Sequence, residues 1–180
     1  MSYLKARSCL VILMSLLFAE LAIAKSEFTS QDFIDVTSIR TISEIETAKI
    51  ALEKSSSLAI KTYAERIIEE QNGALEELRE LAEAQHLHMA SNAELRAKAR
   101  IFVFQRNGRA FDAAYAEMRV IERRKSVNLF RDIARTANGD VRQYATQQLP
   151  ILMRHLYMAQ NLVGDLERGA ALLADNSDHL

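Results

Sequence analysis

Five polar side chains fall on otherwise apolar stripes of helical periodicity, and their types could support chemistry inside a folded domain. They are Glu44, Glu46, Gln71, Arg123 and His155. Each lies near the middle of a segment in which apolar residues recur every three or four positions. Helical bundles build internal metal sites from polar groups placed in this way on facing helices. The set therefore raises three alternatives: a metal centre, a catalytic site, or a structural polar cluster.

The residue types in this set argue against a bound metal. A di-iron centre needs Glu-x-x-His on two helices, and Leu152 rather than a glutamate stands three positions before His155. One histidine and one or two glutamates do not complete a metal shell. Arg123 also argues against a cation, because a guanidinium is always charged and cannot ligate. The sequence thus predicts no metal and no cofactor. It leaves open that His155 is an ordinary core histidine and that Gln71 and Arg123 reach solvent at the edge of a stripe.

The sequence offers no catalytic constellation, and we predict that the protein is not an enzyme. It contains no G-x-S-x-G motif and no phosphate-binding loop. Other residues have simple structural interpretations: core packing for three methionines, a wet bundle edge for three tyrosines, and the surface for two histidines. These residues are Met118, Met153, Met158, Tyr115, Tyr144, Tyr157, His86 and His88.

The elements that must position the five polar residues are predicted from caps and breaks. Thr29 with Asp32 and Ser91 with Glu94 resemble capping boxes, which mark helix starts. The run SSS at 55–57 predicts a break between helices. The first expected helix begins near Thr29 and ends at the SSS break, and the second follows that break and fades over 83–91. The others cover about 91–105, 109–137 and 141–173, the first of these three being short. These segments predict an all-α fold, an antiparallel four-helix bundle with one short extra helix between the second and third long helices.

Two local features should shape the last helix. Gly139 is expected to cap the preceding helix at its C-terminus, with Asp140 as the next N-cap. Pro150 removes a backbone hydrogen bond and crowds the preceding turn, so we expect a kink near Gln147.

The first 24 residues have the order of a secretory signal peptide. Two basic residues precede a short apolar core, and Ala22-Ile23-Ala24 precedes Lys25. We expect cleavage near Ala24 and a periplasmic or secreted protein, with an uncleaved anchor or an N-terminal helix as the alternative. Cys9, the only cysteine, lies in this segment, so the mature chain would have no thiol. The predicted domains are a signal peptide at 1–24, a bundle at 25–174 and a frayed tail at 175–180.

Charge and length limit the classes of partner. The 180 residues carry 23 basic and 24 acidic side chains, a formal net charge of -1. A nucleic-acid binder would need a clustered basic face, which the sequence lacks. We therefore expect no nucleic acid and no stable membrane insertion of the mature chain. An unknown protein partner in the cell envelope is the partner that we consider.

Three segments resemble the DUF4142 family: SEIETAKIALEKSSSLAIKTYAERIIEEQNGALEEL at 43–78, FDAAYAEMRVIERRKSVNLF at 111–130 and LPILMRHLYMAQNL at 149–162. The resemblance covers about 28–166 and implies exported bacterial proteins with a ferritin-like four-helix fold, whose biochemical function is not established. Family members typically carry an Asp-His pair in the second and third long helices. Here the matching positions read Glu70-Gln71 and Glu122-Arg123, while His155 and the Glu44/Glu46 motif are retained.

This departure suggests that Arg123 occupies the space of a cation and pairs with Glu46 or Glu44, with Gln71 and His155 completing a polar network. Two functions follow as expectations. The first is an exported, non-enzymatic helical bundle with a structural, interaction or envelope-stress role. The alternative is a ferritin-like metal-binding or redox protein with a degenerate site inside the bundle.

Overall fold

The computed structural model describes residues 28–99 and 107–177, and within these ranges all regular structure is α-helix. The elements are α2 (Ser30–Lys54), α3 (Leu58–Ala84), α4 (Asn92–Lys98), α5 (Gly108–Thr136) and α6 (Gly139–Ser177). The predicted all-α class is confirmed. The expected signal peptide at 1–24 lies outside the described residues. The short helix was predicted to reach about Gln105, but α4 ends at Lys98 and Ala99 has an extended backbone, so this prediction is wrong. α6 continues to Ser177, past the end expected near Leu173.

Three helices begin at the capping residues that the sequence indicated. The backbone N–H of Asp32 donates to the Thr29 hydroxyl at 3.1 Å, and the Asp32 carboxylate accepts from the Thr29 backbone at 2.8 Å. Ser91 and Glu94 form the same reciprocal pair at the start of α4. Ser57 caps α3 by accepting from the backbone of the third helical residue. These side chains satisfy backbone donors that have no partner in the first turn of a helix.

The junction between α5 and α6 differs from the prediction. Ala137 is the C-terminal cap of α5, whereas Gly139 is the first residue of α6 and has a φ of 57°. Glycine adopts this left-handed backbone without the steric cost of a side chain, which lets the chain reverse here. Gly139 and Asp140 therefore do not serve as the C-cap and N-cap that the sequence suggested.

Pro150 lies inside α6 without interrupting it. Pro150 is exposed, and so is Thr146, whose carbonyl loses its usual N–H partner. Water can donate to that carbonyl in place of the backbone, which makes the proline tolerable. The helix is therefore continuous through Pro150, and the kink near Gln147 stays a prediction.

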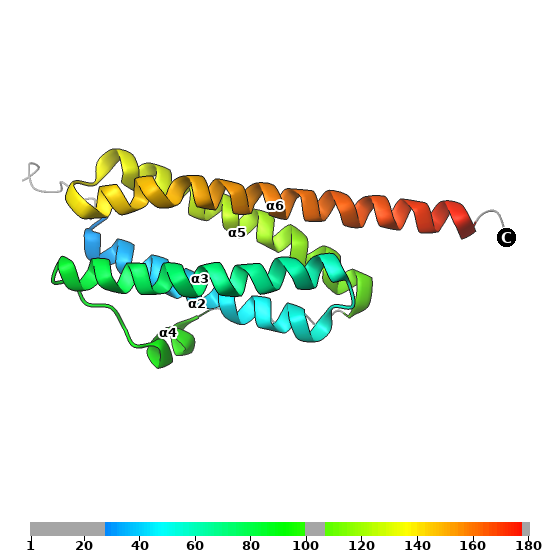
Figure 1. The fold of residues 1–180 in the computed structure, drawn as a ribbon, viewed down its shortest axis with the longest axis horizontal. Coiled ribbons are helices and arrows are strands. Elements are labelled where there is room, and N and C mark those ends of the chain that lie inside the picture. The colour runs from blue at the N-terminus through cyan, green and yellow to red at the C-terminus, as the bar shows by residue number, and fades with distance from the viewer. Residues whose placement is uncertain (1–27, 100–106, 178–180) are drawn as a thin grey trace, which may run out of the picture.

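The long helices form two antiparallel hairpins, α2 with α3 and α5 with α6 (Figure 1). Contacts are most extensive within each hairpin. Between the hairpins, α3 contacts α6 and α2 contacts α5, so each long helix touches two others. The short α4 packs against α2, and the C-terminal end of α6 extends beyond the other helices (Figure 1).

Two apolar clusters lie on either side of a polar level, and a third, which contains Ile45, Leu75 and Leu95, joins α2 and α3 to α4. Of the first two, one contains Phe33, Phe130 and Tyr144, whose rings pack together, with the Phe33 and Phe130 centroids 5.2 Å apart. The other contains Tyr63 and Tyr115, whose ring centroids are 6.3 Å apart. The helix segments between these clusters carry the polar residues that the sequence singled out.

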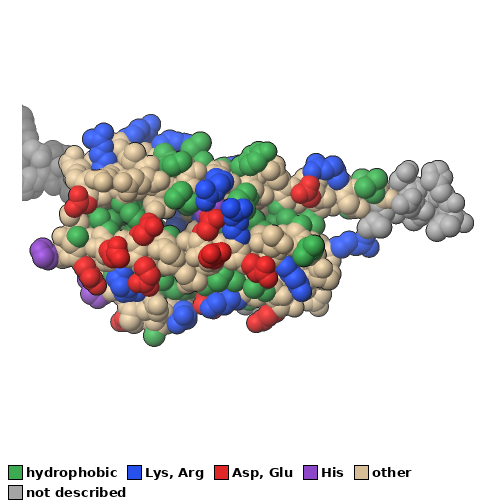
Figure 2. All heavy atoms as spheres, in the orientation of Figure 1, with side chains coloured by type: hydrophobic (Ala, Val, Ile, Leu, Met, Phe, Trp, Pro, Cys, Tyr) green, Lys and Arg blue, Asp and Glu red, His purple; other side chains and the backbone are tan. Residues whose placement is uncertain are grey.

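The outer surface in the view of Figure 2 carries acidic and basic side chains interspersed along the helices, with apolar side chains in the groove between the hairpins. In the described part of the chain, no helix combines the length and the apolar character needed to cross a membrane.

Candidate functional site

A buried ion cluster joins α2 to α5. Nη2 of Arg123 lies 2.6 Å from the Glu44 carboxylate, and Nη1 of Arg119 lies 3.5 Å from the same oxygen. The two arginine side chains are 2–3% exposed, and that of Glu44 is 11% exposed. Arg123 thus pairs with Glu44, one of the two partners proposed for it. The alternative that Arg123 reaches solvent is wrong.

The repeat along α5 explains how both guanidiniums reach one carboxylate. Tyr115, Arg119 and Arg123 are spaced four residues apart, so they lie on the same face of the helix. The Arg119 guanidinium lies over the Tyr115 ring, 5.5 Å from its centroid, a cation–π arrangement. Arg119 was not among the residues predicted from the sequence, although its four-residue spacing from Arg123 was a usable signal.

The cluster holds more hydrogen-bond donors than acceptors. Nε of Arg119, Nε of Arg123 and the Tyr115 hydroxyl are buried without a hydrogen-bond partner among the described residues. Burial raises the pKa of the Tyr115 and Tyr63 hydroxyls, which keeps both protonated at neutral pH. Tyr115 is fully buried, so the predicted wet hydroxyl at the bundle edge is wrong. Two cations sharing one carboxylate leave the cluster with an excess of positive charge.

A second polar contact joins α3 to α6. Nε2 of His155 makes a close hydrogen bond to the Glu70 carboxylate, which also accepts from Arg66 at 2.9 Å and Arg154 at 3.1 Å. Partial burial acts to raise the pKa of Glu70, but hydrogen bonds from Arg66, His155 and Arg154 outweigh it and hold this pKa at about 2. Burial, followed by the positive charge of Arg123, lowers the pKa of His155.

These pKa directions define the protonation of the pair. An ionised carboxylate can only accept, so Nε2 of a neutral His155 donates to Glu70. Nδ1 of His155 is then an acceptor, and it is buried without a partner among the described residues. His155 is fully buried, as the apolar face predicted, and its hydrogen bond to Glu70 is structural in character.

Four of the five predicted residues line one pocket of about 300 Å³: Glu44, Gln71, Arg123 and His155. Glu70, which the sequence analysis did not assign to the cluster, lines it as well. Gln71 is 6% exposed, so it does not reach solvent from the edge of its stripe.

Glu46 lies elsewhere, which contradicts its predicted place in the cluster. Its carboxylate pairs with Lys49 at 2.9 Å and with Arg96 of α4 at 3.2 Å. Residues two apart on a helix point in directions about 200° apart, so Glu44 and Glu46 cannot face the same interior. The apolar row that includes position 46 faces α4 rather than the centre.

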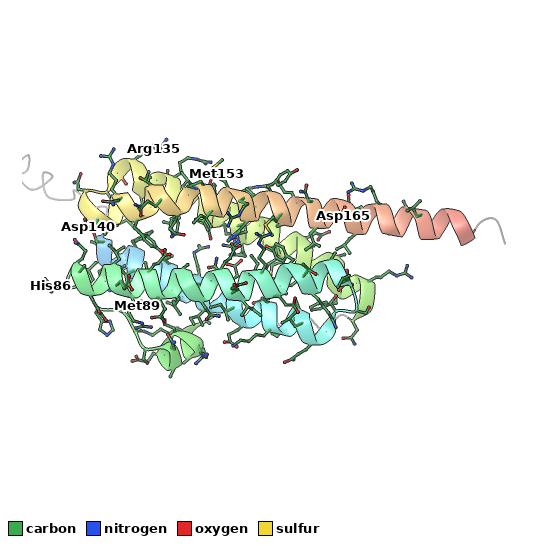
Figure 3. The ribbon with its side chains drawn as sticks, viewed as in Figure 1. His86, Met89, Arg135, Asp140, Met153 and Asp165 are labelled. Atoms are coloured by element: carbon green, nitrogen blue, oxygen red, sulfur yellow. The ribbon has the colours of Figure 1, made fainter. Side chains whose placement is uncertain are left out.

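The donor set does not fit a metal ion. No group of three or more His, Cys, Asp and Glu side chains in the described ranges is arranged to hold one. Nε2 of His155 is engaged by Glu70, and two guanidiniums occupy the position of ligands. One Glu-x-x-His step does exist, from Glu83 to His86, but both residues are exposed at the end of α3, and Figure 3 shows His86 at that end.

The predictions for the remaining methionine, tyrosine and histidine side chains are confirmed in part. Met153 is 51% exposed and points outward from α6 (Figure 3), so its assignment to the core is wrong. Tyr157 is exposed at the edge as predicted, whereas Tyr144 is buried and donates to the Ala74 carbonyl. His86 and His88 are surface residues, as expected.

The fold and interior define an all-helical protein whose buried polar level is organised by arginine–carboxylate and histidine–carboxylate contacts. The family model described as domain of unknown function DUF4142 matches residues 19–162. The chain belongs to this family. No curated protein and no solved structure matches it.

Proposed function

We propose that the protein is an exported, ferritin-like four-helix bundle that acts in the cell envelope without catalysis, in a structural, interaction or stress-related role. Its interior is held by ion pairs in the space where a bundle of this kind would place a metal centre. One observation carries the proposal: Arg119 and Arg123, both buried, share the Glu44 carboxylate at the middle of the interior.

The ring of contacts among the long helices supports the bundle arrangement. α2, α3, α6 and α5 each pack against two neighbours, and two apolar clusters flank one polar level. Ferritin-like proteins place their cofactor-binding side chains at such a level, on facing helices. Here α5 supplies two guanidinium groups at this level, and their permanent charge repels a cation.

The protonation states at the polar level favour a role without catalysis. A general base works best with a pKa near the operating pH and within reach of substrate. Glu70 has a pKa of about 2, which makes it a weak base, and burial raises the pKa of Tyr63 and Tyr115. His155 bonds Glu70 through Nε2 and has no hydroxyl partner among the described residues.

Metal titration tests the central claim. We expect the melting temperature of the chelator-treated mature protein to stay constant as Fe²⁺, Mn²⁺, Zn²⁺ or Cu²⁺ is added, because a ligand stabilises a protein only if its folded state binds it. The control variant is His86→Gln, which removes a surface imidazole that could bind metal nonspecifically. A saturable rise that persists in this variant and disappears in His155→Gln would favour the alternative, a metal-binding protein with a degenerate site.

Export is tested separately. The order of charges, apolar core and small residues at the N-terminus supports cleavage after Ala24. We expect the protein recovered from the periplasmic fraction of a Gram-negative host to begin at Lys25 by N-terminal sequencing. Recovery of the full-length chain in the cytoplasm would contradict the proposed localisation and leave the ion-pair interior unaffected.

A further inference from the structure

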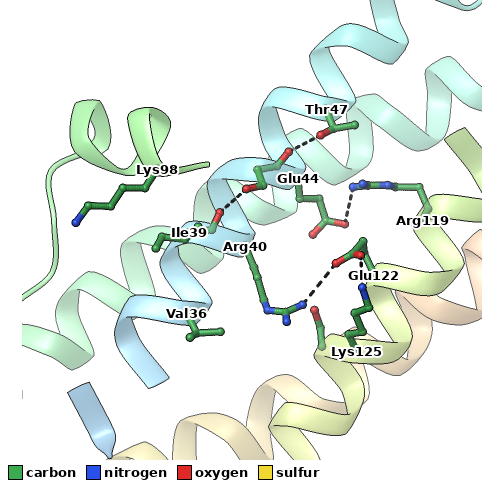
Figure 4. A pocket seen from close by; sticks show the side chains of 11 residues that line it. Val36, Ile39, Arg40, Glu44, Thr47, Lys98, Arg119, Glu122 and Lys125 are labelled. Atoms are coloured by element: carbon green, nitrogen blue, oxygen red, sulfur yellow. Dashed lines mark hydrogen bonds and ion pairs between the residues drawn. The ribbon is translucent and has the colours of Figure 1, made fainter. Parts of the chain in front are cut away.

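A second pocket, of about 450 Å³, opens on the other side of the Glu44 cluster, between α2 and α5 (Figure 4). Its volume lies in the range of small-molecule sites. Four basic and two acidic side chains line it: Arg40, Lys98, Arg119, Lys125, Glu44 and Glu122. The pocket therefore presents more cationic than anionic groups.

Both carboxylates of this pocket are already shared. Glu122 pairs with Lys125 at 2.8 Å and with Arg40 at 3.6 Å. Glu44 is 2.6 Å from Arg123, which lines the other pocket, and 3.5 Å from Arg119. Figure 4 shows Glu44 with Arg119, and Arg40 and Lys125 with Glu122, as facing pairs. Of the two buried arginines, Arg119 thus has the longer contact with a counter-charge.

Arg119 has the features of an anion-binding side chain. It is 2% exposed and lines the pocket, and its Nε is buried without a hydrogen-bond partner among the described residues. An uncompensated buried charge is costly, and a guanidinium has the planar, two-pronged shape that matches a carboxylate. A carboxylate bound here would supply the acceptor and the negative charge that the cluster lacks.

The walls of the pocket select among anions. Val36 and Ile39 supply apolar surface beside the charged residues, and burial of apolar ligand surface against such walls is favourable. We infer that this pocket binds a small organic carboxylate, with its carboxyl group on Arg119 and its hydrocarbon part against Val36 and Ile39. Lys98 and Lys125 also line the pocket, and their positive charges attract an anion at longer range. The assignment goes beyond the proposed function and does not depend on export.

Hexanoate is a suitable probe, measured on the purified mature protein at constant ionic strength. We expect a saturable rise in melting temperature and a heat of binding with hexanoate, weaker binding of acetate, and no saturable effect of hexanol. Inorganic phosphate should bind more weakly than hexanoate, because it gains nothing from the apolar wall. Arg119→Gln should weaken hexanoate binding by at least about tenfold.

Two further variants keep the test informative if Arg119→Gln does not fold. Lys98→Gln, at an exposed position, should weaken binding by a smaller factor than Arg119→Gln. Arg109→Gln removes the same charge ten positions earlier on α5, where Arg109 lines a different pocket, and should bind like the unaltered protein. The inference is overturned if hexanoate does not bind, if phosphate binds as tightly as hexanoate, or if Lys98→Gln and Arg109→Gln are indistinguishable.

Discussion

Glu44 and Glu46 stand two residues apart on α2, yet they occupy opposite kinds of environment. Glu44 points into the interior, where its side chain is 11% exposed and faces two buried arginines. Glu46 points toward α4 and pairs with Lys49 and Arg96, whose side chains are 45% and 52% exposed. The same residue type therefore joins a buried ion cluster at one position and a solvated one at the other.

The comparison shows why counting ion pairs says little about stability. Removing one partner of a buried pair leaves an uncompensated charge in a poorly solvated place, at a cost of about 3–5 kcal/mol. Removing one partner of an exposed pair leaves a charge that water solvates, and typically changes stability by about 0–1 kcal/mol. The direction in which a side chain points from the helix, rather than its charge, decides whether its ion pair is buried or exposed.

The largest expected effect comes from Glu44→Gln. This change leaves Arg119 and Arg123 both without a counter-charge, so the free energy of unfolding should fall toward the upper end of about 3–5 kcal/mol. Urea unfolding followed by circular dichroism measures it. Glu46→Gln is the matched control on the same helix and should cost about 1 kcal/mol or less. Equal losses for the two variants would remove the distinction drawn between the two environments.

Arg123→Ala should rank second. Glu44 keeps Arg119 as a partner in this variant, so the loss should lie toward the lower end of about 3–5 kcal/mol. The same urea titration applies. Arg123→Met fills the space without the charge and should recover part of the loss. If alanine and methionine were equally tolerated at this position with no loss, the ion pair would contribute nothing to folding.

The pH dependence of stability tests a second interior contact, the hydrogen bond between His155 of α6 and Glu70 of α3. The pKa of His155 is lowered in the folded state, so below pH 6.5 the unfolded chain binds a proton that the folded chain resists. Stability should therefore decline as pH falls from 7 toward 5. Below pH 4.5 the low pKa of Glu70, about 2, adds to the decline.

Melting temperatures between pH 5 and pH 7 provide the measurement for this effect. His155→Gln retains a polar side chain but cannot titrate, so the decline in this range should become shallower in that variant. His86→Gln is the control, because it removes an imidazole that is exposed on the surface. An unchanged slope in His155→Gln would assign the decline to other groups.

The smallest expected effect is that of Arg96→Ala. Arg96 pairs with Glu46 across the α2–α4 contact at 3.2 Å, and its side chain is 52% exposed. Its removal should cost less than about 1 kcal/mol and the loss should shrink further in high salt because exposed pairs are screened. Unfolding curves at two salt concentrations check both points. A loss as large as that of Arg123→Ala would show that α4 is held by this contact.

Much of the helical framework follows from local chemistry. Thr29, Ser57 and Ser91 predicted helix starts because a capping oxygen satisfies backbone donors wherever the rest of the chain lies. The burial of His155 followed from its place on an apolar stripe, whereas the stripes left open whether Gln71 and Arg123 are buried or reach solvent. These predictions required only the helical repeat and the types of neighbouring residues.

Other features depended on tertiary contacts that the repeat does not define. Glu46 lies on a face that packs against α4, which a stripe on α2 alone cannot distinguish from the interior. Glu70 reaches His155 because α3 and α6 are neighbours, a pairing set by the order of the helices in space. Tyr115 is buried by a ring contact with Tyr63 of another helix. Predicting any of these contacts would have required the register between the helices.

The hairpin arrangement has a consequence for the order of folding. Packing is densest between consecutive helices, α2 with α3 and α5 with α6, whereas the hairpins meet through contacts such as Glu44–Arg123 and Glu70–His155. Contacts between neighbours in sequence close short loops and form early, while those between distant segments form late. We therefore expect changes at Glu44 or Arg123 to act mainly on the unfolding rate, because a contact absent from the transition state stabilises only the native side of the barrier. The buried arginines would then form their contacts late in folding, after the two helical hairpins have formed, and would slow the separation of the hairpins.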